Sequence, residues 1–297
     1  MIVVDYSQTV ISTIFAEMSG AQLKDVKSEL NLLRHMVITS ILSYKKKYTA
    51  QYGEMVICCD GSNNWRKSVF PYYKASRSTN REKDETDWDG IFHCMTVIRE
   101  ELTQFFPYKV LHIDGAEADD LIAVLAKWSQ TNDLVQNMFG DEPKPYLILS
   151  RDGDFVQLQK YDNVVQYSPI SKKWIKPEVS PEHDLAIKLV TGDAGDGVPS
   201  VLCPDDFFVN KENYGRAKPV TQKVKDKFIN EVHTLNEEEQ ARLNRNRTMI
   251  DLDCIPENVQ NDIISKFESL PPKNKSQLMN YFIKNRMKLL LDSLSDF

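Results

Sequence analysis

Short apolar runs alternate with segments of helical periodicity over residues 1–185 of the chain. The runs have strand length and occupy residues 2–5, 55–60, 109–113, 146–149 and 164–167, and residues 171–174 form a turn into a further predicted strand. Apolar residues at helical spacing predict helices over residues 7–18, 23–46 and 88–106, and one that follows the acids at 117–120. This strand–helix–strand order is typical of a mostly parallel sheet flanked by helices. We therefore predict an α/β domain over residues 1–185.

The pattern changes after this point. A helix is predicted over residues 181–189, and a glycine-rich loop follows it. From about residue 221 the chain is predicted to be helical, in segments near residues 222–232, 236–249, 257–267 and 275–294, separated by Pro256 and by Pro271-Pro272. We predict a smaller all-α domain over residues 186–297.

Carboxylates follow almost every predicted strand of the α/β domain. They are Asp5, Asp60, Glu117, Asp119, Asp120, Asp152 and Asp154, and two more, Asp193 and Asp196, lie in the later glycine-rich loop. The carboxyl ends of parallel strands meet at one edge of a sheet, where ligands bind. Two carboxylates ~4 Å apart repel by about 4 kcal/mol at an effective dielectric near 20. We therefore predict a site for hard divalent cations, Mg²⁺ or Mn²⁺, which prefer oxygen ligands.

Some of these acids also have ordinary structural roles open to them. Asp154 can cap a short helix after the strand, because Asp and Gly are common in turns. The acids at 117–120 stand at a helix N-terminus, which favours anions. For Asp120 we favour the role of a helix cap over that of a metal neighbour.

Residues 65–87, here called the gateway segment, are basic and aromatic. The cations are Arg66, Lys67, Lys74, Arg77, Arg81 and Lys83, and the rings among them are Trp65, Phe70, Tyr72 and Tyr73. The segment has few aliphatic residues, so we expect it to bury little and to be mobile. A solvated surface loop is one interpretation. A nucleic-acid clamp is the one we favour, because cations suit phosphates and rings suit bases.

Composition narrows the class of protein. The 297 residues are 41% hydrophobic and 27% charged, with a formal net charge of −6, which argues against a polycation that coats nucleic acid. The five cysteines show no zinc-ligand spacing, and we expect a reducing compartment. Neither a signal peptide nor a membrane span is predicted.

The order of the acidic motifs resembles that of the flap endonuclease family of structure-specific 5′-nucleases. The motifs are Val3-Val-Asp5, Cys59-Asp60, Glu117-Ala-Asp119-Asp120, Ser150-Arg-Asp152-Gly-Asp154 and Gly192-Asp193-Ala-Gly-Asp196. With Trp65-Arg66-Lys67, Tyr72-Tyr73-Lys74 and Lys172-Lys173-Trp174, the chain is most similar to the RNase H branch found in T-even-type bacteriophages. The resemblance implies a PIN-like nuclease domain, 5′→3′ exonuclease and flap endonuclease activity on duplex DNA and RNA·DNA hybrids, and removal of RNA primers in phage lagging-strand replication.

The resemblance also implies roles for individual residues. Asp60, Glu117, Asp119 and Asp152 would hold a first ion, and Asp152, Asp154, Asp193 and Asp196 would hold or surround a second, with Asp5 nearby. Lys74 and Arg66 match the catalytic cations that neutralise the scissile phosphate, and Asp119 and Asp152 are the acids we regard as catalytic. The expected nucleic-acid contacts are Arg66, Lys67, Tyr72, Tyr73, Lys74, Arg77, Arg81, Lys211 and Lys218.

Residues 181–209 occupy the place of the family's helix–three-turn–helix element, which grips duplex backbone. This chain lacks the lysine of the usual turn, so a monovalent-ion site is not expected; Lys211, Arg216, Lys218, Lys223 and Lys225 are candidate replacements. The resemblance implies that the C-terminal domain contacts the phage single-stranded-DNA-binding protein. Sliding-clamp binding through an N-terminal extension is not expected. We expect a monomer in the cytoplasm of a host bacterium.

Two other functions remain open at this stage. The chain could be a branched-DNA-binding module without catalysis, although the complete acid set argues against it. It could also be a phosphatase with an Asp nucleophile, suggested by Asp152-Gly-Asp154, although such enzymes carry that motif after the first strand.

Overall fold

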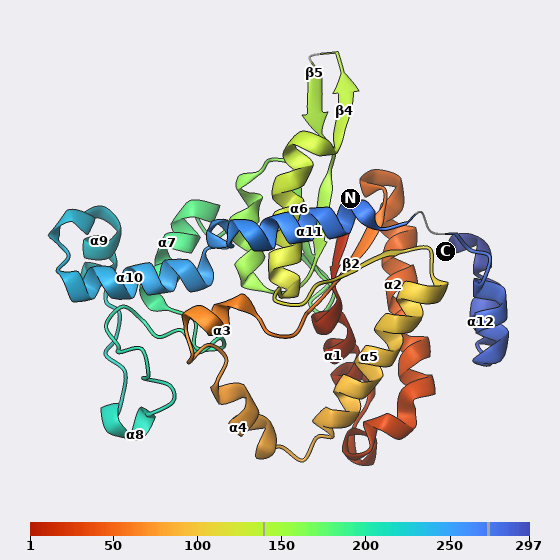
Figure 1. Ribbon diagram of the computed structural model, residues 1–297, viewed down its shortest axis with the longest axis horizontal. Helices are drawn as coiled ribbons and strands as arrows, with labels where there is room; N and C mark the ends of the chain where they lie inside the picture. Colours follow the sequence, from red (N-terminus) through yellow and green to blue (C-terminus); the bar gives the residue numbers. More distant parts are fainter. Residues whose placement is uncertain (139, 272–273) are drawn as a thin grey trace.

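The computed structural model describes residues 1–138, 140–271 and 274–297. Its centre is a six-stranded sheet of order β3-β2-β1-β6-β7-β8 (Figure 1). The strands are β1 (Ile2–Asp5), β2 (Met55–Cys59), β3 (Lys109–His112), β6 (Tyr146–Leu149), β7 (Val164–Ser168) and β8 (Lys173–Ile175). All neighbours pair in parallel except β8, which runs antiparallel to β7. The predicted mostly parallel α/β fold is confirmed.

Alternating side chains of each central strand enter different apolar clusters. In β1, Val3 belongs to a cluster shared with helix α6 (Ala118–Asn132). Ile2 and Val4 belong to the cluster on the opposite face, which includes residues of α1, α2 and α5. This period of two is the signature of a strand buried on both faces. The sheet is thus rigidly held, and its carboxyl edge is a fixed platform.

The remaining helices cover the sheet or extend beyond it. In the first half they are α1 (Tyr6–Glu17), α2 (Leu30–Tyr52), α3 (Trp65–Val69), α4 (Ser76–Glu82) and α5 (Trp88–Phe105), with 3-10 turns η1 (Gly20–Lys24) and η2 (Val26–Glu29). In the second half they are α7 (Pro181–Thr191), α8 (Lys211–Tyr214), α9 (Gln222–Asn230), α10 (Glu237–Ile250), α11 (Glu257–Ser269), α12 (Leu278–Lys284) and α13 (Lys288–Leu291). Four further 3-10 segments are η3 (Gly153–Lys160), η4 (Val232–Thr234), η5 (Leu252–Cys254) and η6 (Leu294–Asp296).

The structure differs from the predicted elements at one helix and one hairpin. The helix expected over residues 23–46 begins only at Leu30, after two 3-10 turns, and continues to Tyr52. A hairpin of β4 (Leu134–Asn137) and β5 (Gly140–Pro143) was not predicted; it projects from the molecule above α6 (Figure 1). The two strands are mostly polar, and only Leu134 and Pro143 in them are partly buried. The sequence of the hairpin therefore has no alternation of apolar and polar residues that would predict strands.

The gateway segment buries more than its composition suggested. Trp65, Phe70 and Tyr73 are all buried, in the apolar cluster that also contains α6. The expectation that this segment buries little is therefore wrong for its first half: aromatic rings replace the missing aliphatic residues. Its second half, with α4, crosses from α3 to α5 as an open arch (Figure 1).

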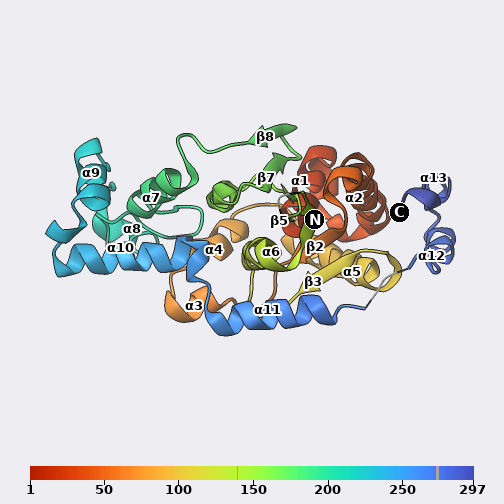
Figure 2. The same ribbon diagram turned by 90° about the horizontal axis from the view of Figure 1, so that it is seen from above.

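The molecule is elongated, with α7–α10 at one end and α12 and α13 at the other (Figure 2). Helix α11 runs between them and packs on α6. Leu278, Phe282 and Phe297 belong to the apolar cluster of α1, α2 and α5, so the last segment returns to the α/β core. Pro272 and Lys273, which the sequence placed in and after a helix break, lie outside the described residues. Within the described ranges, the helices are all too short or too polar to cross a membrane.

Candidate nuclease active site

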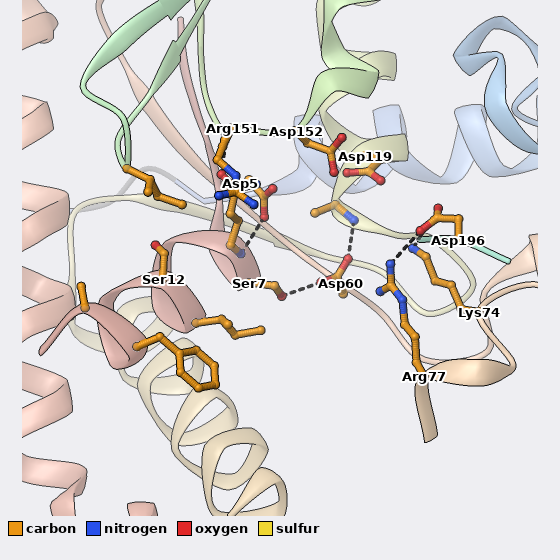
Figure 3. Close-up of a pocket in the computed structure, with 16 residues that line it drawn as sticks. Asp5, Ser7, Ser12, Asp60, Lys74, Arg77, Asp119, Arg151, Asp152 and Asp196 are labelled. Carbon is orange, nitrogen blue, oxygen red and sulfur yellow. Dashed lines mark hydrogen bonds and ion pairs between the residues drawn. The ribbon is translucent and has the colours of Figure 1, made fainter. Parts of the chain in front are cut away.

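A cavity of about 620 Å³ opens at the carboxyl edge of the sheet. Five of the predicted acids line it, Asp5, Asp60, Asp119, Asp152 and Asp196, together with Lys74, Arg77, Ser7, Gln8 and Arg151. Figure 3 shows the acids converging from β1, β2, α6 and the segment after β6. Glu117, Asp154 and Asp193 do not line this cavity. The Asp154 backbone N–H donates to Asp152, and Asp193 accepts the Asp196 backbone N–H.

Asp5 is fixed at the end of β1. It caps α1 by accepting a hydrogen bond from the Gln8 backbone N–H at 3.0 Å, and it accepts another from the Ser150 hydroxyl at 3.0 Å. Burial, followed by the nearby charge of Asp60, raises the pKa of Asp5 to about 7. The carboxylate is thus held in a position where its negative charge lacks a protein counter-charge.

Asp60 is positioned by two different elements. Its carboxylate accepts hydrogen bonds from the Ser7 hydroxyl of α1 and, at 2.9 Å, from the Ala118 backbone N–H at the start of α6. The two contacts fix the strand end relative to both helices. A polar side chain held by backbone and hydroxyl groups is well oriented to bind a ligand in the cavity.

Asp119 and Asp152 both line the cavity, and their side chains lie close to each other (Figure 3). Burial, and then the charge of Asp152, raises the pKa of Asp119 well above its ordinary value. Burial is also the largest cause of the raised pKa of Asp152. Asp152 is fixed by accepting the Asp154 backbone N–H, and the buried Gln166 donates to its backbone carbonyl at 2.6 Å. Two partly buried carboxylates that repel each other favour a bound cation between them.

The other four acids are paired with cations of the protein itself. Lys74 lies 2.7 Å from Glu117 and 3.6 Å from Asp196, and Arg77 lies 2.7 Å from Asp196. Lys188 contacts both Asp154 and, at 2.8 Å, Asp193. Among the described residues there is accordingly no set of three or more Asp, Glu, His or Cys side chains close enough to hold a metal ion as they stand.

Lys74 is held in an uncommon backbone conformation. Its φ is +55°, and its backbone N–H donates to the Asp196 carbonyl at 2.8 Å. Gly197 makes this approach possible, because a Cβ there would lie 2.9 Å from the Tyr72 carbonyl. A left-handed non-glycine residue is costly and persists only when its surroundings impose it. The loop of Asp193 and Asp196 thus fixes where the Lys74 ammonium points.

Arg66 is enclosed in this structure. Its residue exposure is 2%, and its guanidinium lies 2.8 Å from Asp120 and donates to the Met249 carbonyl at 3.1 Å. The guanidinium also lies 3.6 Å from Glu117, but Arg66 does not line the cavity, whereas Arg77 does. The role of Arg66 as a catalytic cation and nucleic-acid contact stays a prediction.

Tyr73 is also enclosed. Its ring is buried, and its hydroxyl lies 2.8 Å from a carboxylate oxygen of Glu117 and 2.8 Å from one of Asp196, so it can donate its single proton to either acid. In this structure the ring has no free face for a base, and its contact with nucleic acid stays a prediction. Asp120 forms the predicted cap: its side chain accepts from the Glu117 backbone N–H at 2.9 Å in a capping box.

The other expected nucleic-acid contacts lie at or near the surface. Lys67, Lys211 and Lys218 are exposed, and Tyr72 is partly buried. Arg81 lies 4.9 Å from the ring of Phe92 and 5.5 Å from that of Trp88. These positions are compatible with contact to a bound nucleic acid and do not test it.

Sequence reasoning missed Lys188 and the hydroxyl and amide groups around the acids. Ser7 and Ser150 orient Asp60 and Asp5, and Gln8 accepts the Arg151 backbone N–H. Gln8 and Lys188 stand at sequence positions typical of any helix surface. Of these residues, only Ser150 could have been found from the sequence, because it belongs to the same motif as Asp152.

The acids and cations together fit a divalent-metal site. Asp5, Asp60, Asp119 and Asp152 supply oxygen ligands alone, which suits Mg²⁺ or Mn²⁺. Burial is the largest cause of the raised pKa values of Asp5, Asp119 and Asp152, and in Asp119 and Asp152 the charges of Lys74 and other cations offset it only in part.

Two family models match the chain. The N-terminal resolvase-like domain of the 5′-3′ exonucleases matches residues 1–183, and the C-terminal domain of T4 RNase H matches residues 179–297. Ribonuclease H of Enterobacteria phage T4 is 34% identical over 304 aligned residues, which cover 99% of this chain and 94% of that protein. The chain belongs to the 5′-3′ exonuclease family. The resemblance inferred from the acidic motifs is confirmed, and this family membership identifies the protein as a nuclease that hydrolyses phosphodiester bonds.

Solved structures of this family have the same fold. A 5′-exonuclease of bacteriophage T5 with bound zinc has a TM-score of 0.61 at 18% identity, covering 91% of this chain and 98% of that one. A bacteriophage T5 flap endonuclease, in a pseudo-enzyme–product complex with DNA and metal ions, has a TM-score of 0.59 at 19% identity, covering 90% and 99%.

Proposed function

We propose that this member of the 5′-3′ exonuclease family is a Mg²⁺-dependent, structure-specific 5′-nuclease that acts on duplex ends, 5′ flaps and RNA·DNA hybrids. One observation carries the proposal: a pair of partly buried acids, Asp119 and Asp152, shares a cavity with two gateway cations, Lys74 and Arg77. Neighbouring acids suit metal ions, and cations beside them suit a phosphodiester.

The proposed metal sites divide the acids into two groups. A first ion would be held by Asp60, Glu117, Asp119 and Asp152. A second would be held or surrounded by Asp152, Asp154, Asp193 and Asp196, with Asp5 nearby. Mn²⁺ is expected to substitute for Mg²⁺. The chemistry that two such ions supply when bound is a water of lowered pKa and charge stabilisation at an in-line phosphoryl centre.

The protein's own residues position the scissile phosphate. Lys74 and Arg77 project into the cavity from the gateway segment, and each lies against Asp196. A phosphodiester oxygen could replace the carboxylate as partner of either cation at little cost, because both contacts are charge-assisted. We assign to Lys74 and Arg77 the orientation of the substrate and the neutralisation of its growing negative charge.

Contacts outside the cavity would set the substrate class. Lys211 and Lys218 lie in the exposed stretch after α7, and Lys67, Tyr72 and Arg81 lie on the gateway segment. Exposed cations at two places on one face would hold the duplex backbone on one side of the cavity and the 5′ strand on the other.

The biological role that we propose is removal of RNA primers in phage lagging-strand replication, inside the host bacterium. Its support is the similarity to a phage ribonuclease H over nearly the full length of both chains. A phage single-stranded-DNA-binding protein is a proposed partner. Exposed apolar side chains on α12 and α13, Met279, Ile283 and Leu289, lie next to Lys284 and Lys288 and could dock an acidic partner.

The test uses a 5′-labelled flap duplex with Mg²⁺ and, in parallel, with EDTA. Short 5′ products that need the metal support the nuclease. Binding without cleavage would instead indicate an inactive DNA-binding module, and hydrolysis only of small phosphomonoesters would indicate a phosphatase.

Asp152→Asn is the decisive variant. We expect it to abolish cleavage and leave DNA binding measurable, because Asp152 is shared by both proposed ions. Asp141→Asn, at an exposed position of the β4–β5 hairpin, is the matched control and should cleave like the wild type. Wild-type turnover by Asp152→Asn at saturating Mg²⁺ would refute the two-metal assignment.

A further inference from the structure

Lys188 lies between two acids that the proposed function assigns to the second metal ion. Its ammonium contacts a carboxylate oxygen of Asp154 and lies 2.8 Å from an oxygen of Asp193. The three residues come from different places: Asp154 from η3, Lys188 from α7, and Asp193 from the loop after it. The ammonium lies between two carboxylates, in the place that a small cation bound by both of them would occupy.

The position of these acids follows from that contact. Asp154 and Asp193 do not line the 620 Å³ cavity, whereas Asp152 and Asp196, their neighbours in sequence, do. Each of the two carboxylates thus already has a cationic partner within the protein, and it is the same one, the Lys188 ammonium.

A divalent cation and an ammonium cannot share these oxygens. Both would lie within ion-pair distance of the same two carboxylates, and like charges so close together repel strongly. The side chain of Lys188 is 27% exposed, and its four-carbon stem gives the ammonium a route to solvent. Metal binding at this place thus requires that Lys188 leave.

We propose that Lys188 is a built-in competitor for the second metal ion. Its ammonium holds the acids together in the metal-free protein and is displaced when the ion binds, so the second site is weaker than the first. The inference rests on the proposed function, because it uses the same acids as metal ligands. Lys188 is thereby a positioning residue that sets the order in which the two ions are loaded.

The test is calorimetric titration of the full-length protein with Mn²⁺ alone, without nucleic acid. Lys188→Met keeps the length of the side chain and removes its charge. We expect the wild type to bind two Mn²⁺ ions per chain with different affinities. In Lys188→Met the affinity of the weaker site should rise about tenfold, which is the order of the free energy of one partly exposed ion pair. The affinity of the tighter site should change less than about twofold. Lys188→Arg, which keeps the charge, should bind like the wild type.

Lys144→Met is the matched control, because Lys144 loses the same charge at a surface pair with Asp133. It should leave both affinities unchanged. Tightening of both sites alike in Lys188→Met, or of neither, would overturn the proposal. So would a crystal structure with Mn²⁺ beside Asp154 and Asp193 in which the Lys188 ammonium stays within about 3 Å of both.

The two proposals fail differently. If the wild type binds no Mn²⁺, the metal assignment of the proposed function falls together with this one. If it binds Mn²⁺ and cleaves the flap, but Lys188→Met binds as the wild type does, the role of Lys188 alone is refuted.

Discussion

Asp5 is 7% exposed, and its carboxylate accepts hydrogen bonds from Gln8 and Ser150 but forms no ion pair with the described residues. The pKa of Asp5 in the folded protein is about 7, whereas an unfolded chain releases this proton near pH 4. The folded state therefore binds more protons in this window, and the free energy of unfolding must fall as the pH rises from about 4 to about 7. Ionised Asp5 destabilises the metal-free protein.

We predict that Asp5→Asn stabilises the metal-free protein above pH 7. Asparagine keeps an oxygen to accept from Gln8 and loses the charge. The free energy of unfolding should rise by about 2–4 kcal/mol at pH 8 and change little at pH 4. Urea denaturation in EDTA at both pH values measures this difference. If Asp5→Asn changes the free energy of unfolding by the same amount at pH 4 and at pH 8, ionisation of Asp5 is not the cause of the change.

Arg66 and Arg77 should differ in kind when each is changed to Met. Arg66 is enclosed beside Asp120, and breaking a buried pair leaves an unpaired charge, so we expect a loss of about 3 kcal/mol of stability. Arg77, whose side chain is 44% exposed, should lose less than about 0.5 kcal/mol. Its cleavage rate should nevertheless fall about 100-fold, by loss of charge stabilisation at the phosphate.

Thermal denaturation and single-turnover cleavage of both variants, below their melting temperatures, separate the two effects. If Arg77→Met is the unstable variant and Arg66→Met the stable, inactive one, the structural role of Arg66 and the substrate-binding role of Arg77 are both wrong.

At this scale the sequence predicted the acids better than the cations. Asp5, Asp60 and Asp152 follow strands, and the parallel sheet alone brings strand ends together. Arg66 and Arg77 lie in a segment without clear periodicity, so nothing local shows which side chain turns inward. That decision depends on Asp120 and the Met249 carbonyl, which are distant in sequence and enter only through tertiary packing.

The gateway segment combines a buried base with an exposed arch. Helix α3 is anchored by Trp65, whose ring N–H donates to Asp120 at 3.2 Å. Helix α4 includes Arg77, and none of its residues whose burial is described belongs to the buried core. The sequence predicted the basic and aromatic character of the whole segment but not this division, because Trp and Tyr serve equally as base-stacking platforms and as core residues.

We predict that trypsin cuts the metal-free protein first near Arg77 or Arg81 in α4, because exposed elements with few buried contacts open most easily. A 5′-flap duplex, added in EDTA so that it stays intact, should protect both sites. Mass spectrometry of the first fragments identifies the cut. A first cut outside residues 65–87 that DNA does not change would contradict the gateway role.

The β4–β5 hairpin and the start of α2 could not be predicted from the pattern of apolar and polar residues. Val135 and Met138 are exposed in and next to the hairpin, so burial leaves no alternation to detect. The chain before α2 forms 3-10 turns, in which Val26 is buried and accepts a hydrogen bond from Cys94. A single buried contact of this kind has no helical period.

At the scale of the whole molecule, the C-terminal segment belongs partly to the α/β core. Leu278, Phe282 and Phe297 are each at most 1% exposed, and the Tyr281 hydroxyl donates to Glu101 of α5 at 2.8 Å. The change from β/α to all-α sequence placed a domain boundary near residue 185, but periodicity cannot show that the end of the chain returns. Matching apolar faces decide that, and they are visible only once both are folded.

Truncation after Asn274 should therefore destabilise the protein. Each fully buried large apolar side chain contributes about 1.5–3 kcal/mol, so losing several removes an amount comparable to the stability of a typical domain. Circular dichroism melting should show a strongly lowered or absent transition. A truncated protein that melts like the full chain would show that this segment is dispensable for folding.

The proposed partner surface needs a test that spares this core. Met279, Ile283 and Leu289 are 56%, 54% and 73% exposed, so changing all three to Glu should alter stability little while adding charges that repel an acidic partner. We expect cleavage of a simple flap at the wild-type rate and loss of stimulation by the cognate single-stranded-DNA-binding protein. Glu at Val135 and Met138, equally exposed in the distant hairpin region, is the matched control and should keep the stimulation. Full stimulation of the triple variant would place the partner elsewhere on the molecule.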